Sequence, residues 1–161
     1  VVLAEAPIAA DSYQTIEVSE LDLTFEVPGS WQQEENDLIW APEPNSDLEL
    51  GFNWLVLQPP QEPEAAFLPS PSQTFSSKQI DPSQGDGRRW TIEVYGPSPG
   101  IGTQAPVVSV ESHVIIIRME GQQRIGIHFY ISAPTASELY NLEPVLDHLL
   151  ESLRFSSPGS S

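Results

Sequence analysis

The chain has 161 residues, which is enough for one domain with its own hydrophobic core. It carries 23 acidic and 6 basic residues, and the formal net charge of −17 argues against nucleic acid or anionic lipid as a direct partner, because both would be repelled. The absence of cysteine excludes disulfides, thiol catalysis and cysteine-ligated metal sites. The simplest interpretation of the acidic excess is solubility rather than a specific cation site.

Both ends of the chain are predicted to lie outside the folded domain. Residues 1–14 are alanine-rich and aperiodic, so we expect a flexible tether there, a single domain over residues 15–156 and a flexible tail over residues 157–161. The sequence begins with Val1 rather than methionine, which is consistent with removal of a signal peptide or a lipoprotein leader. We therefore expect an extracytoplasmic protein, secreted or lipid-anchored, whose only membrane contact would be such an anchor.

Short runs of alternating apolar and polar residues predict strands at 15–19, 21–27, 37–41, 48–57 and 90–95. A tight turn would join the first two of these runs into a hairpin. In the second run every other residue is apolar, so one face of that strand is expected to be buried.

The segment between the fourth and fifth of these strands is rich in proline. Residues 59–77 carry five prolines, and we expect a loop with one or two helical turns within residues 62–68. Residues 79–87 are expected to form another turn region.

The strongest strand signal is a hairpin formed by residues 107–119 and 125–131. A turn at Gly121 would place Met119 opposite Arg124 and Val114 opposite Phe129. One face is then fully apolar and must be covered, whereas the mixed face needs partial cover from a loop or short helix. The apolar face would carry Val114, Ile116, Ile125, Ile127, Phe129 and Ile131, and the mixed face His113, Ile115, Ile117, Met119, Arg124, Gly126, His128 and Tyr130.

A helix is predicted after the hairpin. Thr135 and Glu138 have the spacing of a capping box, which marks a helix start. Asn141 and Pro144 suggest that a short helix over residues 136–140 is followed by a kink or a restart. The main part has one apolar stripe, which we expect to cover the apolar hairpin face. The stripe consists of Leu142, Val145, Leu146, Leu149, Leu150 and Leu153.

Two motifs together resemble the PsbP-like superfamily. One is the strand that closes in Val27-Pro28-Gly29-Ser30-Trp31, and the other is the terminal helix that ends in Ser152-Leu153-Arg154-Phe155. The superfamily includes extrinsic photosystem proteins, the Mog family of Ran-binding import factors and bacterial exported lipoproteins. The resemblance implies an α+β fold, an α/β/α sandwich with a central, mainly antiparallel sheet. The chain departs from the pattern at residues 59–77, where the family usually has a substantial helix.

The resemblance also implies roles for four residues of these motifs. Pro28 and Trp31 would fix a turn and fill the edge of the core, and Leu153 and Phe155 would anchor the chain end. These are structural roles, and they carry no catalytic signature.

His113 and His128 are the strongest candidates for a metal site, because the hairpin register makes them diagonal neighbours on one face. Two imidazoles could bind zinc or copper if a third ligand such as Glu111 came near. The competing interpretation is a pair of partly buried, hydrogen-bonded histidines. His148, on the polar side of the helix, is expected to be solvated.

Other motifs do not support a catalytic or cofactor site. Residues 81–87 lack the ligand pattern of a calcium loop, and the acidic residues 34–37 are expected to be a solvated turn. No nucleophile-elbow motif is present. We therefore expect no catalytic residues and no cofactor.

Aromatic residues are the remaining candidates for a binding surface. Trp31, Trp40, Trp90 and Tyr130 would either fill the core and its edges or, if exposed around a groove, contact a partner. The sequence thus favours a non-enzymatic, monomeric module that binds a protein partner. The alternative is a small-ligand or metal-binding protein with a pocket between the sheet and the loop at 59–77.

Overall fold

The computed structural model describes residues 12–34, 38–69, 72–80, 86–97, 100, 102 and 105–155. The tether and tail predicted at the two ends therefore fall mostly outside the described residues, although the first strand begins at Tyr13. Most of residues 81–87, which were expected to form a turn rather than a calcium loop, also lie outside them. No helix in the described part of the chain has the length and apolar character needed to cross a membrane.

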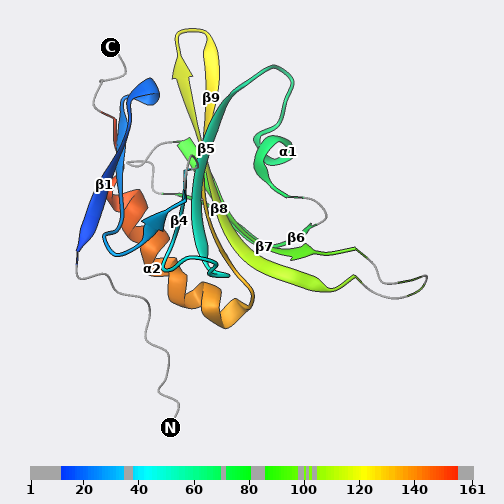
Figure 1. The fold of residues 1–161 in the computed structure, drawn as a ribbon. Helices are drawn as coiled ribbons and strands as arrows, with labels where there is room; N and C mark the ends of the chain where they lie inside the picture. Colours follow the sequence, from blue (N-terminus) through cyan, green and yellow to red (C-terminus); the bar gives the residue numbers. More distant parts are fainter. Residues whose placement is uncertain are drawn as a thin grey trace.

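A seven-stranded antiparallel sheet forms the centre of the molecule (Figure 1). Its strand order is β3-β4-β5-β9-β8-β7-β6, so the β8–β9 hairpin lies inside the sheet and β6 lies at one edge. The strands are β3 (Gln32–Gln33), β4 (Ile39–Ala41), β5 (Glu49–Leu57), β6 (Ser72–Gln79), β7 (Asp86–Tyr95), β8 (Val107–Glu120) and β9 (Gln123–Ala133).

A second sheet of three strands packs against the same side of the large sheet as the main helix. It consists of β1 (Tyr13–Val18), β2 (Leu23–Pro28) and β10 (Arg154–Phe155), and a 3-10 turn, η1 (Ser19–Leu21), joins the first two. The alternating apolar residues of β2 are fully buried in the core that this sheet shares with the helix, as the sequence predicted.

The register of the β8–β9 hairpin confirms the prediction. Met119 pairs with Arg124 and Val114 pairs with Phe129, around a turn in which Gly121 has a φ of 64°. A turn with positive φ suits glycine because it has no Cβ. The predicted apolar face of the hairpin belongs to the main hydrophobic core.

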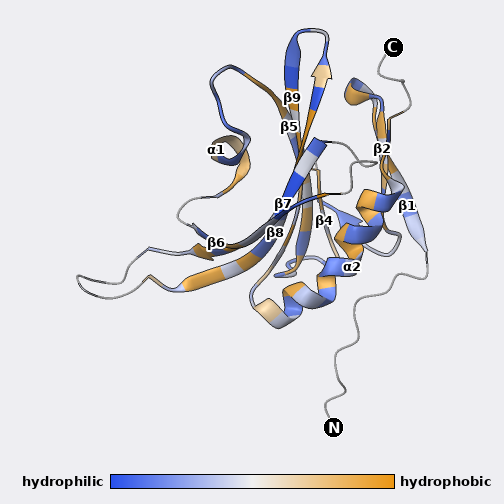
Figure 2. Ribbon diagram, turned by 180° about the vertical axis from the view of Figure 1, so that it is seen from behind, coloured by the Kyte–Doolittle hydropathy of each residue, from blue (hydrophilic) through white to orange (hydrophobic). Residues whose placement is uncertain are grey.

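The helix α2 (Ala136–Ser152) covers that apolar face, and its apolar stripe is buried between the two sheets (Figure 2). Thr135 caps its first turn by accepting a hydrogen bond from the backbone N–H of Glu138. The helix is continuous through Pro144, so the predicted restart near Asn141 was wrong. Proline removes one donor to the carbonyl of Tyr140, and Tyr140 is 70% exposed, so water can reach that carbonyl. The apolar stripe is buried on both sides of Pro144, so it holds both halves of the helix against the same sheet.

The opposite face of the large sheet has a thinner cover. The short helix α1 (Pro63–Phe67) lies within the predicted segment 62–68 and packs over β8. Phe67 and Leu68 join a small apolar cluster on this face with Trp90, Ile92 and Ile115. The sandwich implied by the family resemblance is therefore present, with a five-residue helix as its second helical layer.

The strand β6 is not predicted by the sequence, which indicates a loop over residues 59–77 and a turn from residue 79. Nearly all its side chains are exposed, so no apolar alternation marks it in the sequence. It is a strand because its backbone pairs with β7, with one irregularity between Thr74 and Ser76.

The two motifs that carry the family resemblance have clear structural roles. Gln14 donates hydrogen bonds from its side-chain amide to the carbonyls of Pro28 and Trp31, which fixes the turn after β2. At the other motif, Ser152 Oγ accepts a hydrogen bond of 2.9 Å from the backbone N–H of Glu26. Since Arg154 pairs with Thr24, the side chain of Ser152, the last residue of the helix, extends the β2–β10 ladder by one bond.

Candidate functional site

The two candidate histidines lie on the face of the sheet opposite α2. His113 on β8 pairs with Tyr130, and His128 on β9 pairs with Ile115, which makes the histidines diagonal neighbours as predicted. Nδ1 of His113 and Nε2 of His128 are 2.7 Å apart, and both residues are at most 3% exposed.

A chain of hydrogen bonds runs through this pair. His113 Nε2 lies 2.7 Å from Glu111 Oε1, and His128 Nδ1 lies 2.8 Å from Asn53 Oδ1. Glu111 also accepts hydrogen bonds from Ser109 and Ser132. The row therefore crosses β5, β9 and β8, with a carboxylate at one end and an amide at the other.

The electrostatics of the row follow from its burial. Burial and the neighbouring charge of His113 lower the pKa of His128 to about 3. Burial alone would raise the pKa of Glu111, but the hydrogen bond and charge of His113, with the two serine donors, outweigh it and hold that pKa below its ordinary value. At neutral pH the row thus contains a neutral His128 and an ionised Glu111.

Tyr130 extends the polar cluster toward the surface. Its hydroxyl group donates to Glu49 Oε2 at 2.7 Å, and burial together with this carboxylate raises the pKa of the phenol. Gly51, opposite Tyr130 on β5, leaves room for the ring, because a Cβ there would lie 2.2 Å from it. Of the four aromatic candidates for a binding surface, Tyr130 is the one that is half-buried rather than buried.

The three tryptophan candidates are core residues. Trp31, Trp40 and Trp90 are at most 8% exposed, and Trp40 packs edge-on against Phe25. Their rings are therefore unavailable to a partner in this structure. These residues fill the core and its edges, which was the other interpretation of them.

The geometry of the histidine pair is that of a hydrogen bond. Two nitrogens on one tetrahedral zinc ion, each about 2.0–2.1 Å from the metal, would lie farther apart than 2.7 Å. Glu111, the suggested third ligand, contacts the far nitrogen of His113 rather than the side that His128 shares. Among the described residues, no group of three or more histidine and carboxylate side chains is placed to hold a metal ion.

The space between the sheet and the α1 segment, suggested as a ligand pocket, contains the ring of Phe67. A Cβ added at Gly126 would lie 2.6 Å from that ring, and the ring centroid is 4.9 Å from that of His128. Gly126 therefore provides the room in which Phe67 covers the histidine row.

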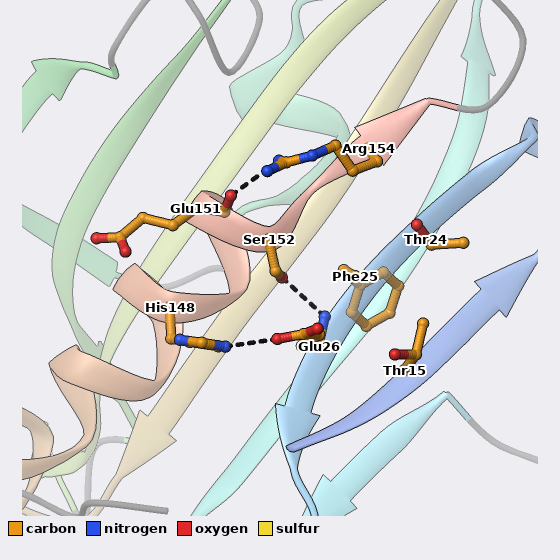
Figure 3. Close-up of a pocket in the computed structure, with 8 residues that line it drawn as sticks. All are labelled: Thr15, Thr24, Phe25, Glu26, His148, Glu151, Ser152 and Arg154. Carbon is orange, nitrogen blue, oxygen red and sulfur yellow. Dashed lines mark hydrogen bonds and ion pairs between the residues drawn. The ribbon is translucent and has the colours of Figure 1, made fainter. Parts of the chain in front are cut away.

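A separate polar hollow of about 410 Å³ lies between α2 and the small sheet (Figure 3). His148 on α2 points toward Glu26 on β2, with 2.7 Å between Nε2 and Oε1, and Tyr13 stacks on the imidazole at a centroid distance of 3.5 Å. The expectation that His148 is merely solvated was wrong, because β1 and β2 come against the polar side of the helix. The hollow is lined by Thr15, Thr24, Phe25, Glu26, His148, Glu151, Ser152 and Arg154.

Arg89 connects the large sheet to α2, a contact that was not predicted from the sequence. Its guanidinium group forms ion pairs with Glu143 and with Asp147 Oδ1, the latter at 2.5 Å, and donates to Ser112 Oγ at 3.1 Å. Arg89 is 9% exposed. The only signal in the sequence is an arginine next to the strand predicted at 90–95, and its ion-pair partners lie more than 50 residues further along the chain.

No protein-family model matches the sequence, and no curated protein matches it significantly. Solved structures do match. The crystal structure of the Saccharomyces cerevisiae Ran-binding protein Mog1p aligns with a TM-score of 0.59 at 10% identity, covering 89% of this chain and 95% of that one. A Mog1 point mutant gives 0.60 at 11% identity, with 89% and 96% coverage. The solution structure of the PsbP protein of the cyanobacterium Synechocystis gives 0.58 at 9% identity, with 96% and 98% coverage.

Proposed function

We propose that this chain, which has the PsbP/Mog-like fold, is a non-enzymatic accessory module that acts by binding a protein partner. The observation that carries the proposal is the state of the histidine row. Three hydrogen bonds engage all four ring nitrogens of His113 and His128 within the protein. Neither imidazole offers a free nitrogen to a substrate or a metal, so the row supports the sheet rather than chemistry.

A second observation favours a protein as the partner. One solved structure of this fold is a Ran-binding protein, so the fold supports recognition of a protein. At 10% identity that partner does not transfer to this chain, because function depends on the site and not on the fold. We also propose an extracytoplasmic location, which rests on the resemblance to exported members of the superfamily and which cell fractionation tests.

The test compares the wild type with a double variant, His113→Gln and His128→Gln, whose amides can replace some of the internal hydrogen bonds. A tagged full-length chain of each form is cross-linked in extracts of its source cells, and captured proteins are quantified by mass spectrometry. We expect the same partner to be enriched by both forms.

Substrate turnover by the wild type is screened in parallel with hydrolase, transferase and redox substrates. Turnover that disappears in the double variant, while the variant remains folded by circular dichroism, would refute the proposal. Capture of no protein by either form would also count against it.

A further inference from the structure

The edge strand β6 and the helix α2 form the two sides of an open trough. α2 packs over β8 and β9 and against β2, whereas β6 lies at the end of the strand order. Two adjoining hollows of about 280 and 300 Å³ occupy the gap, and both are lined by Lys78, Arg89 and Asp147. One side of the trough is therefore a strand whose outer edge pairs with no described strand of this chain.

The helix side of the trough presents an aromatic ring and carboxylates in one row. Tyr140, Glu143, Asp147 and Glu151 are spaced by three, four and four residues, which puts them on one stripe of a helix. All four line the hollows, and Tyr140 is 70% exposed. An exposed aromatic face beside carboxylates is suited to arginine and lysine side chains.

The structure already contains one example of this recognition. The guanidinium group of Arg89, on the floor of the trough, is bound by Glu143 and Asp147 of the same row. Glu151 lies one turn further along, and its carboxylate has no ion pair or hydrogen bond with the described residues. The row therefore has an acceptor for a second cation next to the one it holds.

The strand side limits where a partner can pair. The irregularity between Thr74 and Ser76 interrupts the register of β6, which leaves residues 76–79 as the regular stretch nearest the helix row. A second copy of this chain is a poor occupant, because each copy carries a net charge of −17. That same charge favours association with a basic segment.

We propose that this trough binds an extended, basic segment of the protein partner, which adds a strand to the edge of β6 and directs arginine or lysine side chains toward Glu151 and Tyr140. The inference rests on the proposed function and names its interface and the chemistry of its partner. Backbone hydrogen bonds along β6 would supply affinity, and the helix row would select basic side chains.

The experiment uses the full chain and an alternating arginine–threonine peptide of the same length as β6. Binding is followed by amide chemical shifts in NMR and by titration calorimetry. We expect shifts confined to residues 76–79 and to the α2 row. An alternating glutamate–threonine peptide should not bind.

The matched variants are Glu151→Lys in the trough and Glu120→Lys at the tip of the β8–β9 hairpin. Both substitutions change the net charge equally, and both residues are exposed. We expect Glu151→Lys to weaken binding about tenfold and Glu120→Lys to weaken it less than about twofold. Tyr140→Ala should weaken binding without changing the net charge.

Equal losses in the two charge variants, or shifts that avoid β6, would overturn the inference, because attraction would then depend on net charge alone. The protein captured in the test of the proposed function shows whether this inference or the proposed function itself fails. If that partner is still captured by Glu151→Lys and Tyr140→Ala, the module binds a protein and the trough is not its interface. If the wild type captures no protein, the proposed function itself fails.

Discussion

His113 Nδ1 and His128 Nε2 lie 2.7 Å apart, and their ring planes are within 7° of parallel. With the Asn53 oxygen toward His128, Nδ1 of His128 donates and its Nε2 must accept. His113 Nδ1 then donates to His128, and its Nε2 lies 2.7 Å from the Glu111 carboxylate. The row is thus a continuous run of hydrogen bonds from a neutral His128 to an ionised Glu111, inside the sheet.

Acidification should destabilise the fold through His128. In the unfolded chain this imidazole takes up a proton near its ordinary pKa of 6.5, whereas in the folded chain it does so only near pH 3. The unfolded state therefore binds more protons in that interval, and the free energy of unfolding falls by about 1.4 kcal/mol per pH unit, or about 3 kcal/mol between pH 7 and pH 4.

Urea unfolding followed by tryptophan fluorescence at several pH values measures this loss. In His128→Gln the fall between pH 6.5 and pH 4 should be smaller by about that amount. Identical slopes for the variant and the wild type would show that His128 titrates normally in the fold. Below pH 4.5, the ordinary pKa of a glutamate, Glu111 should add to the loss of stability. Its pKa in the folded chain is also lowered, so the stabilisation that it provides disappears as the carboxylate is protonated.

Replacing Arg89 by methionine should loosen the attachment of α2 to the sheet. The substitution removes two ion pairs and leaves Ser112 without its donor, and we expect a loss of about 2 kcal/mol in the free energy of unfolding. This loss is smaller than that expected for a fully buried ion pair, because the Asp147 side chain is 54% exposed and can be hydrated. The measurement is chemical denaturation.

Arg88→Met is the matched control for that variant. Arg88 is exposed and faces the other side of β7. Among the described residues, its guanidinium group donates only to Ser77. Removing this guanidinium group should therefore lower the free energy of unfolding by less than about 0.5 kcal/mol. Equal costs for the two substitutions would mean that the Arg89 ion pairs do not hold the helix.

Gly126→Ala should displace the ring of Phe67 from the histidine row. The added Cβ would lie 2.6 Å from the ring, so either the ring or the short helix α1 must shift, at a cost of about 1–2 kcal/mol. In the background of Phe67→Leu, which removes the far part of the ring, the same alanine should cost clearly less. A double-mutant cycle by urea unfolding measures this coupling, and a coupling energy of zero would show that Phe67 does not pack there.

Ser152→Ala should cost about 1–2 kcal/mol, because it leaves the backbone N–H of Glu26 without its acceptor at the point where the helix joins the small sheet. Ser137→Ala, on the exposed first turn of the same helix, is the control and should cost less than about 0.5 kcal/mol. The measurement is thermal unfolding of the two variants at equal protein concentration. A similar melting temperature for both would argue against the ladder role of Ser152.

The elements that have a local period could be predicted from the sequence. The β8–β9 register, the faces of the hairpin and the stripe of α2 could be predicted because alternation and the spacing of leucines are set by backbone geometry within one segment. The diagonal placement of His113 and His128 followed from that register. Two short motifs, around Pro28 and Ser152, were enough to identify the fold.

Contacts between side chains of different elements are set by the tertiary structure. β6 became a strand through its pairing with β7, His148 found Glu26 on a distant strand, and Arg89 found its carboxylates on the last helix. It also decided that the four ring nitrogens of the histidine pair are all engaged within the sheet, because Asn53 and Glu111 come from two other positions in it. Such contacts depend on how segments far apart in the chain are packed, and no periodicity within a single segment records them.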